Sequence, residues 1–199
     1  MLRYKTISLI DPDLRQRARR SKALAGGRFH VEPYESIAEF SRAGDESTLI
    51  LIRNLDDAVA NLFEDMRTRG YWAPALAFGT NLDPLRCSQL FLMGLVGYLP
   101  SDFKQVDLEA VIDGITEPLT GLIDLRNAAA KSRRRLKRLS KREAQILDQL
   151  QSGSNNREIG ELLSISMRTV EIHRSNMLRK LDATSAAAIR MTTEAKIFG

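Results

Sequence analysis

Few residues of this chain could do chemistry, and the most unusual is an arginine at the end of a buried run. The stretch "LILIRNLDD" places Arg53 directly after four apolar residues, and Asp11 follows another apolar run in the same way. In doubly wound α/β domains, ligands and reacting groups lie where the parallel strands end. A guanidinium stays protonated, so Arg53 can bind a carboxylate but cannot be a nucleophile.

The remaining candidates do not predict an enzyme. The chain has two histidines, His30 and His173, and one cysteine, Cys87. No nucleophile–base pair and no metal-ligand spacing is present in the sequence, so we expect no cofactor and no metal. Cys87 is most simply a packed small hydrophobe, and a single cysteine allows no internal disulfide, which fits a reducing cytoplasm.

Charge divides the chain into two parts. Residues 1–123 carry 14 Lys and Arg against 17 Asp and Glu, whereas residues 124–199 carry 16 against 8. A compact basic segment either binds a polyanion or is only a solvated basic face. The longest apolar runs, such as residues 90–96, are too short to cross a membrane, and the N-terminus does not resemble a signal peptide.

Short apolar runs alternate with helical patterns over the first part of the chain. Strands are expected near residues 6–10, 30–31, 48–52, 75–78 and 97–100, and the helices lie between them. The run at 48–52 shows no alternation, as in a strand that is buried on both faces. Residues 1–118 are therefore predicted to form an α/β domain, a doubly wound, parallel, five-stranded sheet.

A helical stripe leads from this region to the end of the chain. Apolar and small residues recur at steps of three or four over residues 108–139. Pro118, between two glycines, predicts a kink or a restart that is capped by Thr116 or Glu117. The first part of the stripe packs on the sheet. The basic linker over 119–138 either continues such packing or forms a dimer seam.

Residues 139–199 predict an all-α domain of four helices. Ser140 and Glu143 have the spacing of a capping box, and Ser166 caps a third, basic helix. Two short helices joined by a turn of three or four residues form a helix-turn-helix. The fourth helix starts at Ser185, and its small side chains suit packing against a second copy.

The segment "LSKREAQILDQLQSGSNNREIGELLSISMRTVEIHRSNMLRKL", residues 139–181, closely resembles the DNA-binding domain of bacterial LuxR/NarL-type regulators, in particular the FixJ-like branch. The resemblance implies that the third helix enters the major groove of double-stranded DNA. The base contacts that it implies are Glu171, Ile172, Arg174 and Ser175. The implied phosphate contacts are Asn155, Asn156, Arg168, Thr169, His173, Arg179 and Lys180, of which His173 could equally be a core residue.

The same resemblance implies an N-terminal receiver domain of a two-component system, which takes a phosphoryl group on an aspartate beside Mg²⁺. The nucleophile position falls on Arg53, and only Asp11 remains of the acidic pair, because Pro12 follows it. The hydroxyl position falls on Gly79 and the lysine position on Ser101. We therefore interpret residues 1–118 as a pseudo-receiver in which Arg53 pairs with Asp11 or Asp13.

The sequence thus predicts a cytoplasmic, response regulator-like transcription factor that binds DNA specifically as a homodimer, without control by phosphorylation. RNA polymerase or a regulatory protein is a further expected partner, and a membrane is not. Two alternatives stay open at this point. The receiver-like domain could chiefly dock a kinase or another regulator, or it could sense a small ligand in its altered site.

Overall fold

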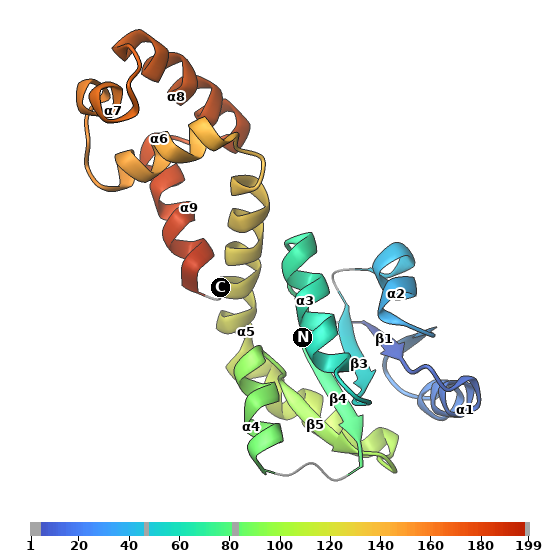
Figure 1. The fold of residues 1–199 in the computed structure, drawn as a ribbon. Coiled ribbons are helices and arrows are strands. Elements are labelled where there is room, and N and C mark those ends of the chain that lie inside the picture. The colour runs from blue at the N-terminus through green and yellow to red at the C-terminus, as the bar shows by residue number, and fades with distance from the viewer. Residues whose placement is uncertain (1–4, 46–47, 81–83, 198–199) are drawn as a thin grey trace. The chain divides into compact units, whose positions relative to one another are not determined.

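Five strands form one parallel sheet in the order β2-β1-β3-β4-β5 (Figure 1). The computed structural model describes residues 5–45, 48–80 and 84–197. The strands are β1 (Thr6–Ile10), β2 (His30–Tyr34), β3 (Leu49–Arg53), β4 (Ala75–Gly79) and β5 (Gly97–Pro100). The helices between them are α1 (Leu14–Leu24), α2 (Ile37–Ala43), α3 (Ala58–Arg69) and α4 (Pro84–Met93). The predicted α/β class and the five strands are confirmed, and β2 is longer than expected.

Alternate side chains of each strand enter one of two cores. Leu9, Leu51 and Phe78 lie on the face that packs with Leu24 of α1 and Leu108 of the following helix. The opposite face carries further apolar side chains of the same strands and packs with helices α2, α3 and α4. Burial on both faces explains the runs without alternation, and it leaves the strand ends as the place where polar groups gather.

A single long helix, α5 (Gln105–Leu136), follows the sheet and contains Pro118. The predicted restart is wrong, because Thr116 lies inside the helix and donates its hydroxyl to the Ile112 carbonyl at 2.6 Å. Proline removes one backbone hydrogen bond at a cost of about 3 kcal/mol. Packing along the rest of the helix, where residues such as Leu108 and Ala129 are buried, offsets that cost.

The chain divides into two compact units, Met1–Asp124 and Leu125–Gly199. The second unit contains the end of α5 and helices α6 (Lys141–Gln151), α7 (Asn156–Leu163), α8 (Met167–Leu181) and α9 (Ser185–Ile197). These helices confirm the predicted all-α domain. The division into parts at residues 118 and 138 stays a prediction.

The end of α5 packs within its own unit. Leu136 and Leu139 lie against a core that includes Met177 and Leu181 of α8 and Ala188 of α9. This packing uses, inside one chain, the part of the helical stripe that was also considered as a dimer seam. Over the described residues, no helix is long and apolar enough to span a membrane.

Candidate functional site

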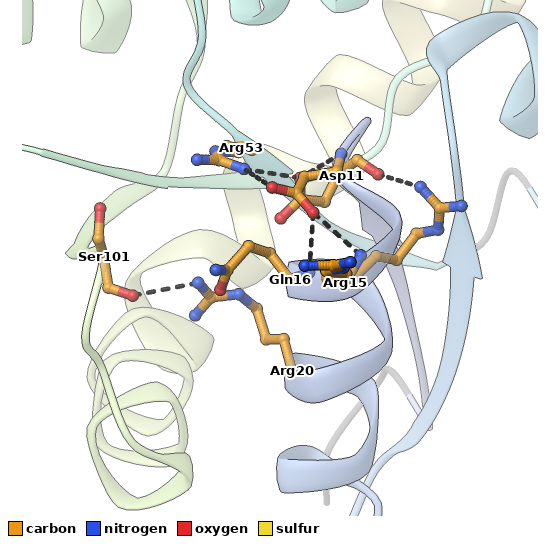
Figure 2. A network of polar contacts seen from close by, with 8 residues as sticks. Asp11, Arg15, Gln16, Arg20, Arg53 and Ser101 are labelled. Atoms are coloured by element: carbon orange, nitrogen blue, oxygen red, sulfur yellow. Dashed lines mark hydrogen bonds and ion pairs between the residues drawn. The ribbon is translucent and has the colours of Figure 1, made fainter.

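The carboxyl edge of the sheet holds a buried aspartate that is paired with an arginine (Figure 2). Asp11 has no solvent exposure, and its Oδ1 accepts hydrogen bonds from Arg53 Nη1 at 3.1 Å and from the Asp13 amide at 3.0 Å. A second Asp13 contact, from its Oδ2 to Arg53 Nη1, measures 3.9 Å. The predicted pairing of Arg53 with Asp11 is confirmed, and it puts a permanent cation at the end of β3.

A second arginine, which sequence reasoning missed, reaches this edge from α1. The Arg20 guanidinium lies 4.2 Å from the ring centre of Phe78 and 4.7 Å from that of Phe103. Its Nη2 donates to the Ser101 carbonyl at 3.1 Å, as Figure 2 shows. Burial lowers the pKa of Arg20, and the Asp11 carboxylate opposes that change. Arg20 precedes the buried Leu24 by four residues, so the two share one face of α1. That spacing was the signal in the sequence that Arg20 points toward the sheet.

Gly79 and Tyr98 meet at the ends of β4 and β5. A Cβ atom on Gly79 would lie 2.5 Å from the Tyr98 hydroxyl oxygen, so this hydroxyl fills the space of a side chain there. The same hydroxyl donates to the Thr80 carbonyl at 3.1 Å, and burial raises the pKa of Tyr98. At Gly79, where the receiver resemblance puts a side-chain hydroxyl, the hydroxyl of Tyr98 from the neighbouring strand β5 occupies the space instead.

These donors do not fit a divalent cation. Pro12 offers no carboxylate, and the permanently charged Arg53 guanidinium lies 3.1 Å from Asp11 Oδ1, where it would repel a metal ion. Among the described residues, no group of three His, Cys, Asp or Glu could hold a metal ion. An open cavity of about 280 Å³ lies beside the pair and is lined by Pro12, Arg53, Asp56 and Ile37, among others.

The second candidate site is the turn between α7 and α8 with the surface of α8. The α7 helix ends at Leu163 and is capped by Ser164, whose φ of 53° is left-handed. Ser166 then begins α8 by accepting a hydrogen bond from the Thr169 amide at 3.0 Å. This short turn fixes the direction of α8 relative to α7, as in a helix-turn-helix.

The two sides of α8 have different environments. Val170, Met177 and Leu181 have no solvent exposure and form the inner side. The outer side is exposed and carries most of the predicted contacts, namely Arg168, Glu171, Ile172, Ser175 and Arg179. Glu171, Ile172 and Ser175 are thus available to base edges, with Arg168 and Arg179 toward the two ends of the helix.

Arg174 does not share that outer side. It follows Val170 by four residues and precedes Met177 by three, which places it on the inner side. Its guanidinium donates to the Asn156 Oδ1 atom at 3.0 Å and to the Ser185 Oγ atom at 2.9 Å. These bonds join α8 to the first residues of α7 and α9, so the contact of Arg174 with guanine, which stays a prediction, would have to replace them.

Lys180, like Arg174, binds another side chain of its own unit. Its Nζ lies 2.7 Å from the Oε2 atom of Glu143, whose side chain is 4% exposed. Burial would raise the pKa of Glu143, but the Lys180 ammonium and the Ser140 donors lower it more. A phosphate contact by Lys180 would compete with this buried pair, so the structure favours a stabilising role.

The other predicted phosphate contacts lie at helix starts or on half-buried positions. Asn155 caps α7 and accepts from the Glu158 amide at 3.1 Å, and Asn156 receives the Arg174 bond. Thr169 lies in the first turn of α8, where backbone amides point outward and favour an anion. His173 is half-buried, which leaves both of its predicted roles open.

Comparison with known proteins agrees with this geometry. Residues 137–192 match the family described as bacterial regulatory proteins, luxR family. This segment is a LuxR-type domain. The match covers the helix-turn-helix and most of α9, and it supports a DNA-binding transcriptional regulator of the LuxR family.

Relatives of similar organisation extend the likeness beyond the LuxR-type domain. The chain is 26% identical over 184 residues to the transcriptional regulatory protein TdiR of Thauera aromatica, which covers 90% of this chain and 81% of TdiR. It is 30% identical over 144 residues to the transcriptional regulatory protein FixJ of Rhizobium meliloti (strain 1021), which covers 72% of this chain and 65% of FixJ.

The fold of the first unit also has a solved counterpart. The crystal structure of FixJ-N superposes with a TM-score of 0.50 at 16% sequence identity, over 59% of this chain and 96% of that one. At this identity the likeness shows the fold alone. The N-terminal domain is therefore receiver-like, and the chemistry of its edge has to be argued from its own residues.

Proposed function

We propose that this LuxR-type regulator binds double-stranded DNA sequence-specifically through the outer side of α8, without control by aspartyl phosphorylation. The observation that carries the proposal is the exposed set of Glu171, Ile172 and Ser175, with a cation toward each end of the helix. Glu171 can accept from a cytosine amino group, and Ile172 can contact a thymine methyl group. Arg168 and Arg179 supply charge for phosphates, which position the helix in the groove.

Independence from phosphorylation rests on the edge of the sheet. The Arg53 guanidinium lies where the receiver resemblance puts the nucleophile, and it neutralises Asp11 at 3.1 Å. The Arg53 guanidinium thus supplies permanently the positive charge beside Asp11 that a bound Mg²⁺ would otherwise supply. We infer that the receiver-like domain has one resting arrangement that does not respond to a phosphodonor.

A dimer is part of the same proposal, because one small domain reads too few base pairs for high specificity. Leu136 and Leu139 are less available to this contact, because they pack against a core inside the chain. The most exposed large apolar side chains among those described include Leu85 and Leu92 of α4, at 69% and 86% exposure. These residues are available to a second copy, whereas Ala188 of α9 is buried.

The test is DNA binding by the full chain to sequences selected from a random pool, with and without a small-molecule phosphodonor. We expect specific binding as a dimer whose mass and affinity the donor leaves unchanged. Glu171→Ala should change the selected base at one position in each half-site, whereas Asp148→Ala, an exposed change on α6, should not. Loss of binding without a donor, or a phosphoryl group found on the chain, would contradict the proposal.

The cavity beside Arg53 favours one second candidate function, the sensing of a small molecule. Its lining combines apolar side chains such as Ile37 with charged side chains such as Arg53 and Asp56. Asp56 has a left-handed φ of 50°, which is uncommon for a residue other than glycine. A ligand-dependent rise in the melting temperature of the wild type, absent in a variant with Ile37→Trp, would support this function.

A further inference from the structure

The segment from the end of α5 to the start of α6 carries more basic residues than the fold and the proposed contacts of α8 use. Residues 131–142 contain eight Lys and Arg and no Asp or Glu. Within this segment, therefore, no acidic partner at three or four residues' distance can neutralise them. Such an excess of one sign raises the local potential and attracts a polyanion.

Three of these residues form an outward-facing row, which we name the basic ridge: Lys131, Arg134 and Arg138. Lys131 and Arg134 are three residues apart and share one side of α5, and Arg138 follows in the turn after Leu136, where the helix ends. All three are exposed, and none has an ion pair or side-chain hydrogen bond to the described part of the chain. Arg135 and Arg142 are used differently, because they donate to the Leu181 and Leu163 carbonyls.

Contacts of neighbouring residues hold the basic ridge beside the C-terminal end of α8. Arg135 Nη1 donates to the Leu181 carbonyl at the end of α8, at 3.3 Å. Ser132 Oγ donates to Glu194 Oε2 of α9 at 2.8 Å, and Leu136 packs in the core of the same unit. These contacts hold the end of α5 at the C-terminal end of α8.

The length of α8 brings that end close to the DNA backbone. A helix of 15 residues is about 22 Å long, whereas the major groove is about 12 Å wide. If the outer side of α8 reads bases, part of the helix must extend beyond the groove and pass a phosphate strand. Groups held beside the C-terminal end then meet phosphates rather than bases.

We propose that the basic ridge is a second DNA-contact surface, which binds phosphates flanking the base pairs read by α8. This inference rests on the proposed function, since it needs α8 in the major groove. Each phosphate neutralised releases counterions, so the basic ridge increases affinity and salt dependence without adding base preference.

The experiment compares full-length chains on the selected DNA over a series of salt concentrations. One variant carries Lys131→Gln, Arg134→Gln and Arg138→Gln. The charge-matched control carries Arg15→Gln, Arg19→Gln and Lys22→Gln on α1, which are also exposed. Both variants change the net charge equally, so only contact with DNA distinguishes them.

We expect the slope of log affinity against log salt to fall in magnitude by about 2.7 in the ridge variant, or about 0.9 for each contact. Between 50 and 200 mM salt, the wild type should then lose about 40-fold more affinity than the variant. Base preference should not change, and the control should keep the wild-type slope. The single variant Arg134→Gln should reduce the slope by about 0.9, which tests the idea without the triple change.

An unchanged slope in the ridge variant, with specific binding by the wild type, would overturn the inference and leave the proposed function standing. Tighter binding by the ridge variant would also overturn it, because the ridge would then be held by an acidic surface of the chain or a protein partner. Absence of specific binding by the wild type would overturn the proposed function itself.

Discussion

Replacing Arg53 by methionine should destabilise the first unit, because it leaves a buried carboxylate without its cation. Methionine keeps an unbranched apolar stem but removes the guanidinium that lies 3.1 Å from Asp11 Oδ1. The Asp11 side chain has no exposure, so water cannot replace the lost partner without local opening. The amide of Asp13 remains as a donor and compensates only in part.

The size of the effect follows from burial on the two sides of the pair. Breaking a fully buried ion pair costs about 3–5 kcal/mol. The Arg53 side chain is 33% exposed, so the pair is partly screened, and we expect a loss of about 2–3 kcal/mol. For a unit of this size, that loss lowers the melting temperature by about 10 °C.

Urea unfolding followed by tryptophan fluorescence measures this loss in the correct unit. Trp72 is the single tryptophan, and it packs against the core of the sheet domain. The signal therefore reports the first unit even if the second unfolds separately. Arg67→Met, which removes an exposed ion pair with Glu64 on α3, is the matched control and should change stability by less than about 0.5 kcal/mol.

A double variant separates charge from packing. Asp11→Asn in the Arg53→Met background removes the unpaired carboxylate, so it should recover more than half of the lost stability. The reasoning would be refuted if Arg53→Met cost no more than the control, or if the double variant were no more stable than Arg53→Met.

Three further predictions concern groups whose partners lie far apart in the chain. Arg174→Ala should weaken binding to all DNA sites about tenfold, because it removes the charge-assisted bonds to Asn156 and Ser185 at 3.0 and 2.9 Å. Competitive site selection should find the base preference unchanged. Gly79→Ala should cost about 1–2 kcal/mol by displacing the Tyr98 hydroxyl, and urea melts should show less than half of that cost in a Tyr98→Phe background. The lowered pKa of Glu143 stabilises the second unit above the ordinary carboxyl value of 4.5, and this stability is lost as pH falls through the folded value. Circular dichroism melts at pH 7 and pH 4 should therefore show a smaller loss in Glu143→Gln than in the wild type.

Local signals in the sequence determined the elements of this protein and the type of each domain. Apolar runs without alternation predicted β3 and β4, and the spacing of Ser140 and Glu143 predicted a capping box that the structure contains. The loss of the aspartate nucleophile was also visible in the sequence, because Arg53 stands at the position where the receiver resemblance requires a carboxylate. Such signals act between residues that are adjacent or one helical turn apart, so no tertiary information is needed to see them.

Only the tertiary structure decided what several polar side chains bind. Arg174 and Lys180 have basic side chains that suit DNA, yet one bridges α7 and α9, and the other pairs with Glu143, 37 residues away. Arg20 contacts Ser101 across 81 residues. Pro118 stays inside a continuous helix because packing along its length offsets the missing hydrogen bond. The partner of a long polar side chain depends on which elements pack beside it, and that arrangement is set by the whole core rather than by neighbouring residues.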